Sequence, residues 1–109
     1  MDNEEFITMK DLHDRYKGLP ATEIVLDVRS PEEYMAGHVP GSKNIPHDSV
    51  RSHFEDLKRF RKVYIHCRSG GRAKQAYETL SALGLTNMIC VTGSGMDDWV
   101  KSGYPIQKK

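Results

Sequence analysis

The most reactive feature of the sequence is a single cysteine, Cys67, between an apolar run and the start of a helical pattern. The five residues that follow it are Arg68, Ser69, Gly70, Gly71 and Arg72. A short glycine-containing turn can point several backbone N–H groups inward, and the helix that follows adds the positive end of its dipole. Together with the two arginines, these surroundings favour a thiolate. The segment therefore predicts a cysteine nucleophile in an anion-binding loop, called here the Cys67 loop (residues 67–72).

The elements that must position this loop alternate between strands and helices along the chain. Apolar runs predict buried strands over residues 24–28, 63–66 and 88–91. The expected helices run from a cap at Thr8 to Gly18, from a cap at Ser30 to Gly37, over residues 50–58, over residues 73–83 with Leu83 on the inner face, and over residues 96–103. This order predicts an α/β fold, a largely parallel central sheet flanked by helices on both faces.

Polar or reactive residues follow three of the predicted strands. Arg29 comes at the end of the first, Cys67 at the end of the second, and a glycine-bearing loop over residues 92–95 follows the third. In open α/β sheets the functional crevice lies at the carboxyl ends of the strands. We therefore expect these three segments to meet around one site.

Length and charge limit the functional classes. The 109 residues predict one domain over residues 1–109, and a net charge of +1 argues against general nucleic-acid or membrane-surface binding. No apolar stretch approaches the roughly 20 residues needed to span a bilayer, and residues 1–5 are acidic rather than signal-like. The chain has only two cysteines, which argues against a disulfide scaffold. A cytoplasmic location is the resulting expectation.

Four segments in order resemble the signatures of a single-domain rhodanese, a family of thiosulfate or persulfide sulfurtransferases. They are residues 26–34, LDVRSPEEY; residues 37–46, GHVPGSKNIP; the Cys67 loop; and Gly95-Met96 followed by Trp99. The chain departs from the family at Ser94, where a second glycine is usual. The resemblance covers nearly the whole chain and implies the rhodanese-like fold.

The resemblance also implies a mechanism. Cys67 takes a sulfane sulfur from a small anionic donor, thiosulfate or a persulfide, and passes it to a thiol, cyanide or protein-cysteine acceptor. The N–H groups of residues 68–72 would hold the negative sulfur, Arg68 would receive the donor, and Arg72 would either do the same or lock the loop. Asp27 and Arg29 are expected to support the loop. We expect no metal and no cofactor, since the five histidines show no metal-ligand spacing with the cysteines.

Other chemically notable residues favour structural interpretations. Cys90 lies within an apolar run and is interpreted as a core residue, and His66 should point to the opposite strand face from Cys67. His38 is expected to fix a turn and Trp99 to pack. Two alternative functions remain open: a cysteine-based phosphatase or arsenate reductase, and a non-catalytic rhodanese-like binding module. The phosphatase loop is one residue longer, because it has five residues between cysteine and arginine whereas this chain has four.

Overall fold

The computed structural model describes residues 6–108, which fold around a five-stranded sheet in the order β1-β5-β4-β2-β3. The strands are β1 (Phe6–Ile7), β2 (Glu23–Asp27), β3 (Lys43–Asn44), β4 (Lys62–His66) and β5 (Met88–Val91). Every neighbouring pair is parallel, which confirms the α/β prediction. The acidic residues 1–5 lie outside the described part of the chain.

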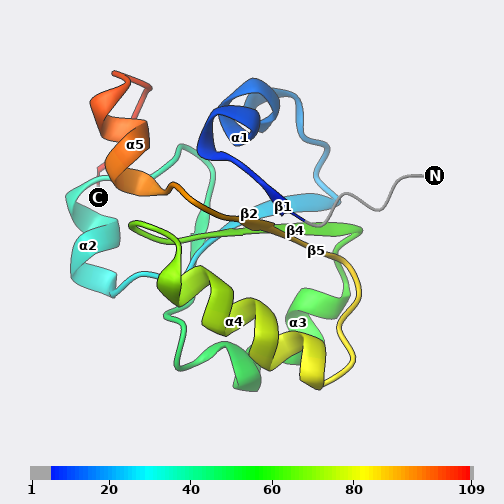
Figure 1. Cartoon of the computed structure of the whole chain (residues 1–109). Coiled ribbons are helices and arrows are strands. Elements are labelled where there is room, and N and C mark those ends of the chain that lie inside the picture. The colour runs from blue at the N-terminus through cyan, green and yellow to red at the C-terminus, as the bar shows by residue number, and fades with distance from the viewer. Residues whose placement is uncertain (1–5, 109) are drawn as a thin grey trace.

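Helices cover both faces of this sheet, as the sequence predicted. They are α1 (Met9–Arg15), α2 (Pro31–Ala36), α3 (Phe54–Lys58), α4 (Gly71–Ala82) and α5 (Met96–Lys101), with 3₁₀ turns at Tyr16–Gly18 and Val50–His53. Figure 1 shows α1 on one face and α3 and α4 on the other. A separate apolar core fills each face. Within residues 6–108, no helix is long and apolar enough to cross a membrane.

Two helix starts follow the capping chemistry that the sequence indicated. The Thr8 side chain accepts a hydrogen bond from the Asp11 amide, and the Asp11 carboxylate accepts one from the Thr8 amide. Ser30 and Glu33 form the same reciprocal box at the start of α2. Each box satisfies two amides that have no partner within the helix. The prediction that Gly37 ends α2 is confirmed.

The end of α4 corrects one prediction about its inner face. Leu83 is 38% exposed instead of buried, because the chain leaves the helix there. The amides of Gly84 and Leu85 donate to the carbonyls of Ser81 and Leu80, a Schellman turn that requires the positive φ of Gly84. This turn places Leu85, not Leu83, in the core.

A helix start and an edge strand also differ from the sequence prediction. The helix after Cys67 begins at Gly71, two residues before the expected Ala73, so part of the Cys67 loop belongs to its first turn. The edge strand β1 was not predicted, because two residues are too few for a strand pattern to be recognised.

Candidate active site

The side chain of Cys67 points from the end of β4 toward the face covered by α4. Val63, Ile65 and Cys67 belong to one apolar core and Tyr64 to the other, as strand alternation requires. Cys67 is 1% exposed, so its sulfur lies at the bottom of the loop. His66 lies instead against Asp27, with 3.9 Å between Nε2 and Oδ2. This placement agrees with the expectation that His66 is no direct base for Cys67.

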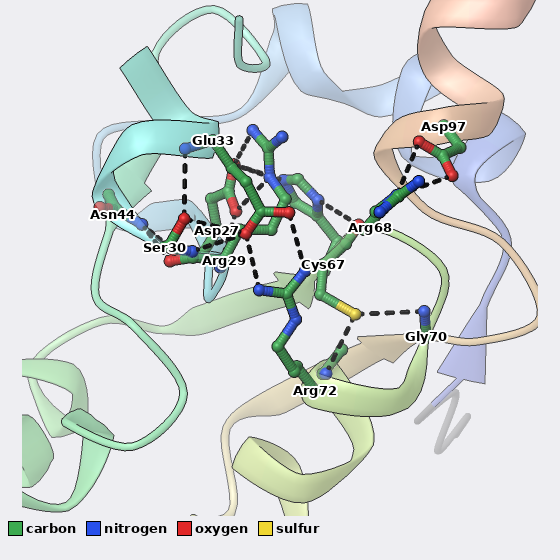
Figure 2. A network of polar contacts seen from close by, with 12 residues as sticks. Asp27, Arg29, Ser30, Glu33, Asn44, Cys67, Arg68, Gly70, Arg72 and Asp97 are labelled. Carbon is green, nitrogen blue, oxygen red and sulfur yellow. Dashed lines mark hydrogen bonds and ion pairs between the residues drawn. The ribbon is translucent and has the colours of Figure 1, made fainter. Parts of the chain in front are cut away.

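Two backbone amides point at the sulfur of Cys67 (Figure 2). The N–H of Gly70 donates to Sγ across 3.1 Å, and the N–H of Ala73 donates across 3.2 Å. Gly70 has a φ of 120°, a conformation that favours glycine, and it directly precedes α4. The sulfur therefore accepts hydrogen bonds at the positive end of a twelve-residue helix, an arrangement that stabilises negative charge.

Arg72 in the first turn of α4 forms a bidentate ion pair with Glu33 of α2. The two nitrogen–oxygen distances are 2.7 and 2.9 Å, and both side chains are about 30% exposed. Hydrogen bonds from Arg72 lower the pKa of Glu33 to about 2. Glu33 raises the pKa of Arg72, and the charge of Cys67 is a smaller cause in the same direction. Of the two roles considered for Arg72, binding the donor or locking the loop, this contact favours the second.

Arg68 turns outward and contacts Asp97 of α5. Its Nε lies 3.1 Å from Oδ2 of Asp97, and the two side chains are 63% and 60% exposed. The remaining predicted loop residues, Ser69 and Gly71, are also exposed. Within the Cys67 loop, the Gly70 amide points to the sulfur, and the two arginine side chains contact carboxylates of α2 and α5.

The start of α5 holds the loop from outside through backbone contacts. The amide of Met96 donates to the Cys67 carbonyl at 2.8 Å, and that of Asp97 donates to the Arg68 carbonyl at 3.2 Å. Gly95 is required for this approach, since a Cβ there would lie 2.4 Å from both carbonyl oxygens. Ser94 is accommodated, because its hydroxyl accepts from the Met9 amide at 2.9 Å.

Asp27 and Arg29 form a buried pair behind the loop. The Asp27 carboxylate accepts from Nε and Nη2 of Arg29 at 2.7 to 3.0 Å, and from the Arg29 amide. Nη2 also donates to the Gly37 carbonyl at 2.8 Å. The pair therefore joins the end of β2 to the end of α2, the helix that carries Glu33.

Two further titratable groups are buried near the site. Burial lowers the pKa of His66, although Asp27 opposes this, and the ring Nε2 has no hydrogen-bond partner among residues 6–108. Burial, and secondarily the charge of Cys67, raises the pKa of Cys90 to about 11. Cys90 is completely buried in the core that contains Cys67. Its position agrees with the structural role predicted from the sequence.

His38 and Trp99 also have structural contacts. Nδ1 of His38 lies 2.7 Å from the Tyr34 carbonyl, and Trp99 is buried and donates to the Pro105 carbonyl. No group of three or more potential metal-binding side chains occurs in the described residues.

Three site features were missed by the sequence reasoning. They are the Ala73 amide, the Glu33 carboxylate and the Asp97 carboxylate. Glu33 carried a signal, since it is the third residue after the Ser30 cap, but that pattern predicts capping alone. Asp97 lies 29 residues from its partner, so only the packing of α5 reveals the contact.

The fold and the loop together define an α/β domain with a cysteine at the end of a central strand, held by amides of the following helix. A family model named "Rhodanese-like domain" matches residues 8–102. The chain therefore belongs to the rhodanese-like family.

Individual relatives support this assignment. The chain is 33% identical to the chloroplastic thiosulfate sulfurtransferase 16 of Arabidopsis thaliana, over 75% of this chain and 78% of that protein. A crystal structure of a rhodanese-related protein from Thermoplasma volcanium has a TM-score of 0.81 and 36% identity, covering 96% and 99% of the two chains. The chain spans only 40% and 59% of the Bacillus subtilis relatives YrkF and YqhL, which are 39% and 31% identical to it.

Proposed function

We propose that this protein is a sulfurtransferase that carries a sulfane sulfur as a persulfide on Cys67. The donor is thiosulfate or a persulfide, and the acceptor is a thiol, cyanide or the cysteine of a partner protein. Membership in the rhodanese-like family and the sulfurtransferase relatives support the reaction class. The observation that carries the proposal is the pair of amides, from Gly70 and Ala73, directed at the sulfur of Cys67.

The first half-reaction forms one sulfur–sulfur bond and breaks another. The Cys67 thiolate attacks the outer sulfur of thiosulfate, and sulfite leaves with the electron pair of the broken bond. The enzyme then carries a persulfide whose terminal sulfur is negative. Amides at the start of α4 stabilise such a charge in the way that an oxyanion hole does. The thiolate is the form of a cysteine that acts as the nucleophile.

The second half-reaction releases the same sulfur. An acceptor thiolate attacks the terminal sulfur of the Cys67 persulfide, and the Cys67 thiolate leaves. A thiol acceptor becomes a persulfide, and cyanide becomes thiocyanate. The same two amides serve this step as well, because they can donate hydrogen bonds to the thiolate that is released.

Phosphate-ester chemistry is the nearest alternative and is less well supported. A phosphoryl group needs a loop that surrounds three oxygens, and this loop has only four residues between Cys67 and Arg72. The guanidinium of Arg72 is also engaged by both oxygens of Glu33. A single terminal sulfur needs fewer donors, which is why we prefer sulfur transfer.

Turnover with two substrate types tests the proposal. We expect the protein to convert thiosulfate and cyanide to sulfite and thiocyanate, to show no comparable hydrolysis of an aryl phosphate, and to lose thiocyanate formation in Cys67→Ser. Phosphate release that depends on Cys67 would favour the phosphatase alternative. Inactivity of the folded protein with thiosulfate, persulfide and phosphate substrates would favour a binding module.

A further inference from the structure

Both arginines of the Cys67 loop already have a carboxylate partner. Arg72 forms a partly exposed ion pair with Glu33, and Arg68 forms an exposed one with Asp97. Each of the two positive charges of the loop is thus paired with a negative charge. A donor that approaches Cys67 therefore meets backbone amides, but gains little attraction from free cationic side chains.

Asp97 is fixed beside the loop by more than its ion pair. Its amide donates to the Arg68 carbonyl, and the preceding Met96 amide donates to the Cys67 carbonyl. Figure 2 shows the Arg68 side chain directed toward Asp97 and away from the Cys67 sulfur. The neighbouring Asp98 makes a different contact, because its carboxylate accepts a hydrogen bond from the Gly95 amide. Asp97 is thus the carboxylate of α5 that contacts the exposed arginine.

We propose that Asp97 is a specificity-determining residue that disfavours thiosulfate relative to persulfides of low charge. This inference rests on the proposed sulfur transfer. Thiosulfate brings two negative charges, which repel Asp97 and must compete with it for Arg68. A persulfide R–S–SH can deliver the same sulfur with less charge: the Cys67 thiolate attacks its outer sulfur, the S–S bond of the donor breaks, and R–S⁻ leaves.

The expected size of the effect follows from the exposure of the pair. In water-like surroundings, two unit charges about 4 Å apart change a binding constant about fivefold. For a donor with two negative charges, the change in the logarithm of the binding constant is twice as large. A greater distance between Asp97 and the donor reduces it, and so does salt. Removal of the Asp97 charge should therefore raise the use of thiosulfate about three- to tenfold. The change should lie mainly in KM, since the Gly70 and Ala73 amides that hold the reacting sulfur remain.

The test compares Asp97→Asn with the unchanged protein on two donors. These are thiosulfate and the persulfide of 2-mercaptoethanol, whose organic part is uncharged. We expect kcat/KM for thiosulfate to rise about three- to tenfold at low salt. This gain should shrink in 0.5 M salt, because the Debye length there is roughly a few Å and the charge of Asp97 is screened. The persulfide value should change less than about threefold. Glu55→Gln, which removes an exposed charge from α3, is the matched control and should leave both donors unaffected.

The outcomes separate the two claims. A fall in thiosulfate use in Asp97→Asn, or an equal change for both donors, would show that Asp97 positions the loop and would overturn the specificity role while sulfur transfer stands. A rise in kcat/KM of Asp97→Asn that is confined to thiosulfate supports the specificity role. If the unchanged protein transferred sulfur from neither donor, the proposed function itself would fail, and the inference with it.

Discussion

The guanidinium of Arg72 and the carboxylate of Glu33 join the start of α4 to the start of α2, although 39 residues separate them in the sequence. Glu33 also accepts from the Ser30 amide, so one side chain caps α2 and holds the Cys67 loop. The loop is therefore supported from α2 through this pair and from α5 through the amides of Met96 and Asp97.

Replacement of Glu33 by glutamine should weaken this support in a pH-dependent way. The folded pKa of about 2 lies below the ordinary value of 4.5, so the ion pair contributes fully above about pH 4.5 and is lost as the pH falls toward 2. Because the pair is partly exposed, we expect Glu33→Gln to lower the free energy of unfolding by about 1–2 kcal/mol at pH 7. Urea titrations at pH 7 and pH 3 should show the difference shrinking at the lower pH.

The control for that measurement is Glu32→Gln, which removes an exposed charge from the same turn of α2. Its effect should be only a few tenths of a kcal/mol at pH 7, the usual size for a helix-terminus charge, so its change between pH 7 and pH 3 should be correspondingly small. A Glu33→Gln difference that stayed constant from pH 7 to pH 3 would contradict the ion-pair account.

Gly70→Ala should impair persulfide formation more than it impairs stability. The φ of 120° is strained for any residue with a Cβ, so the amide that donates to Cys67 should move. We expect the rate of sulfur loading to fall about 10- to 100-fold. Gly84→Ala carries a similar strain, at φ 99° in the turn after the C-terminal end of α4, and should lose stability but keep its loading rate. Equal loading rates in the two variants would count against a role for the Gly70 amide.

Gly95→Ala tests the contact between α5 and the loop. Its Cβ would lie 2.4 Å from the carbonyl oxygens of Cys67 and Arg68, and backbone atoms cannot move aside as a flexible side chain can. We expect a loss of at least about 2 kcal/mol in the free energy of unfolding, measured with urea. Gly18→Ala, where a Cβ meets nothing within 4 Å, should be nearly neutral. Similar stabilities of the two variants would disprove the close approach.

Cys90 should remain unmodified in the folded protein. Its complete burial and a pKa of about 11 keep it as an inaccessible neutral thiol at pH 8. Iodoacetamide treatment followed by peptide mass mapping should find no label on Cys90 until urea is added. Rapid labelling of Cys90 without urea would contradict this placement.

The sequence predicted what depends on local patterns. The strand over residues 88–91, the caps at Thr8 and Ser30, and the placement of the Cys67 loop between a strand and a helix all follow from residues close together in the chain. Leu83 was misplaced because helical spacing continues past the point where the Schellman turn ends the helix.

The partners of the two arginines required the tertiary structure. Arg72 and Arg68 look like free anion-binding side chains in the sequence, and the structure places Glu33 and Asp97 against them. Those contacts depend on how α2 and α5 pack beside the loop, and helical periodicity carries no information on that packing. The same limit applies to the Ala73 amide, which reaches the sulfur only because α4 begins at Gly71.

The most direct test of the account is intact-protein mass spectrometry of the reduced protein after incubation with thiosulfate. Cys67→Ser and Cys90→Ala serve as paired variants, the second chosen because alanine leaves no buried hydroxyl without a partner. We expect one added sulfur atom in the unchanged protein and in Cys90→Ala, none in Cys67→Ser, and its removal by cyanide as thiocyanate. Added sulfur that persisted in Cys67→Ser, or its absence from the unchanged protein with both thiosulfate and a persulfide donor, would contradict a Cys67 persulfide.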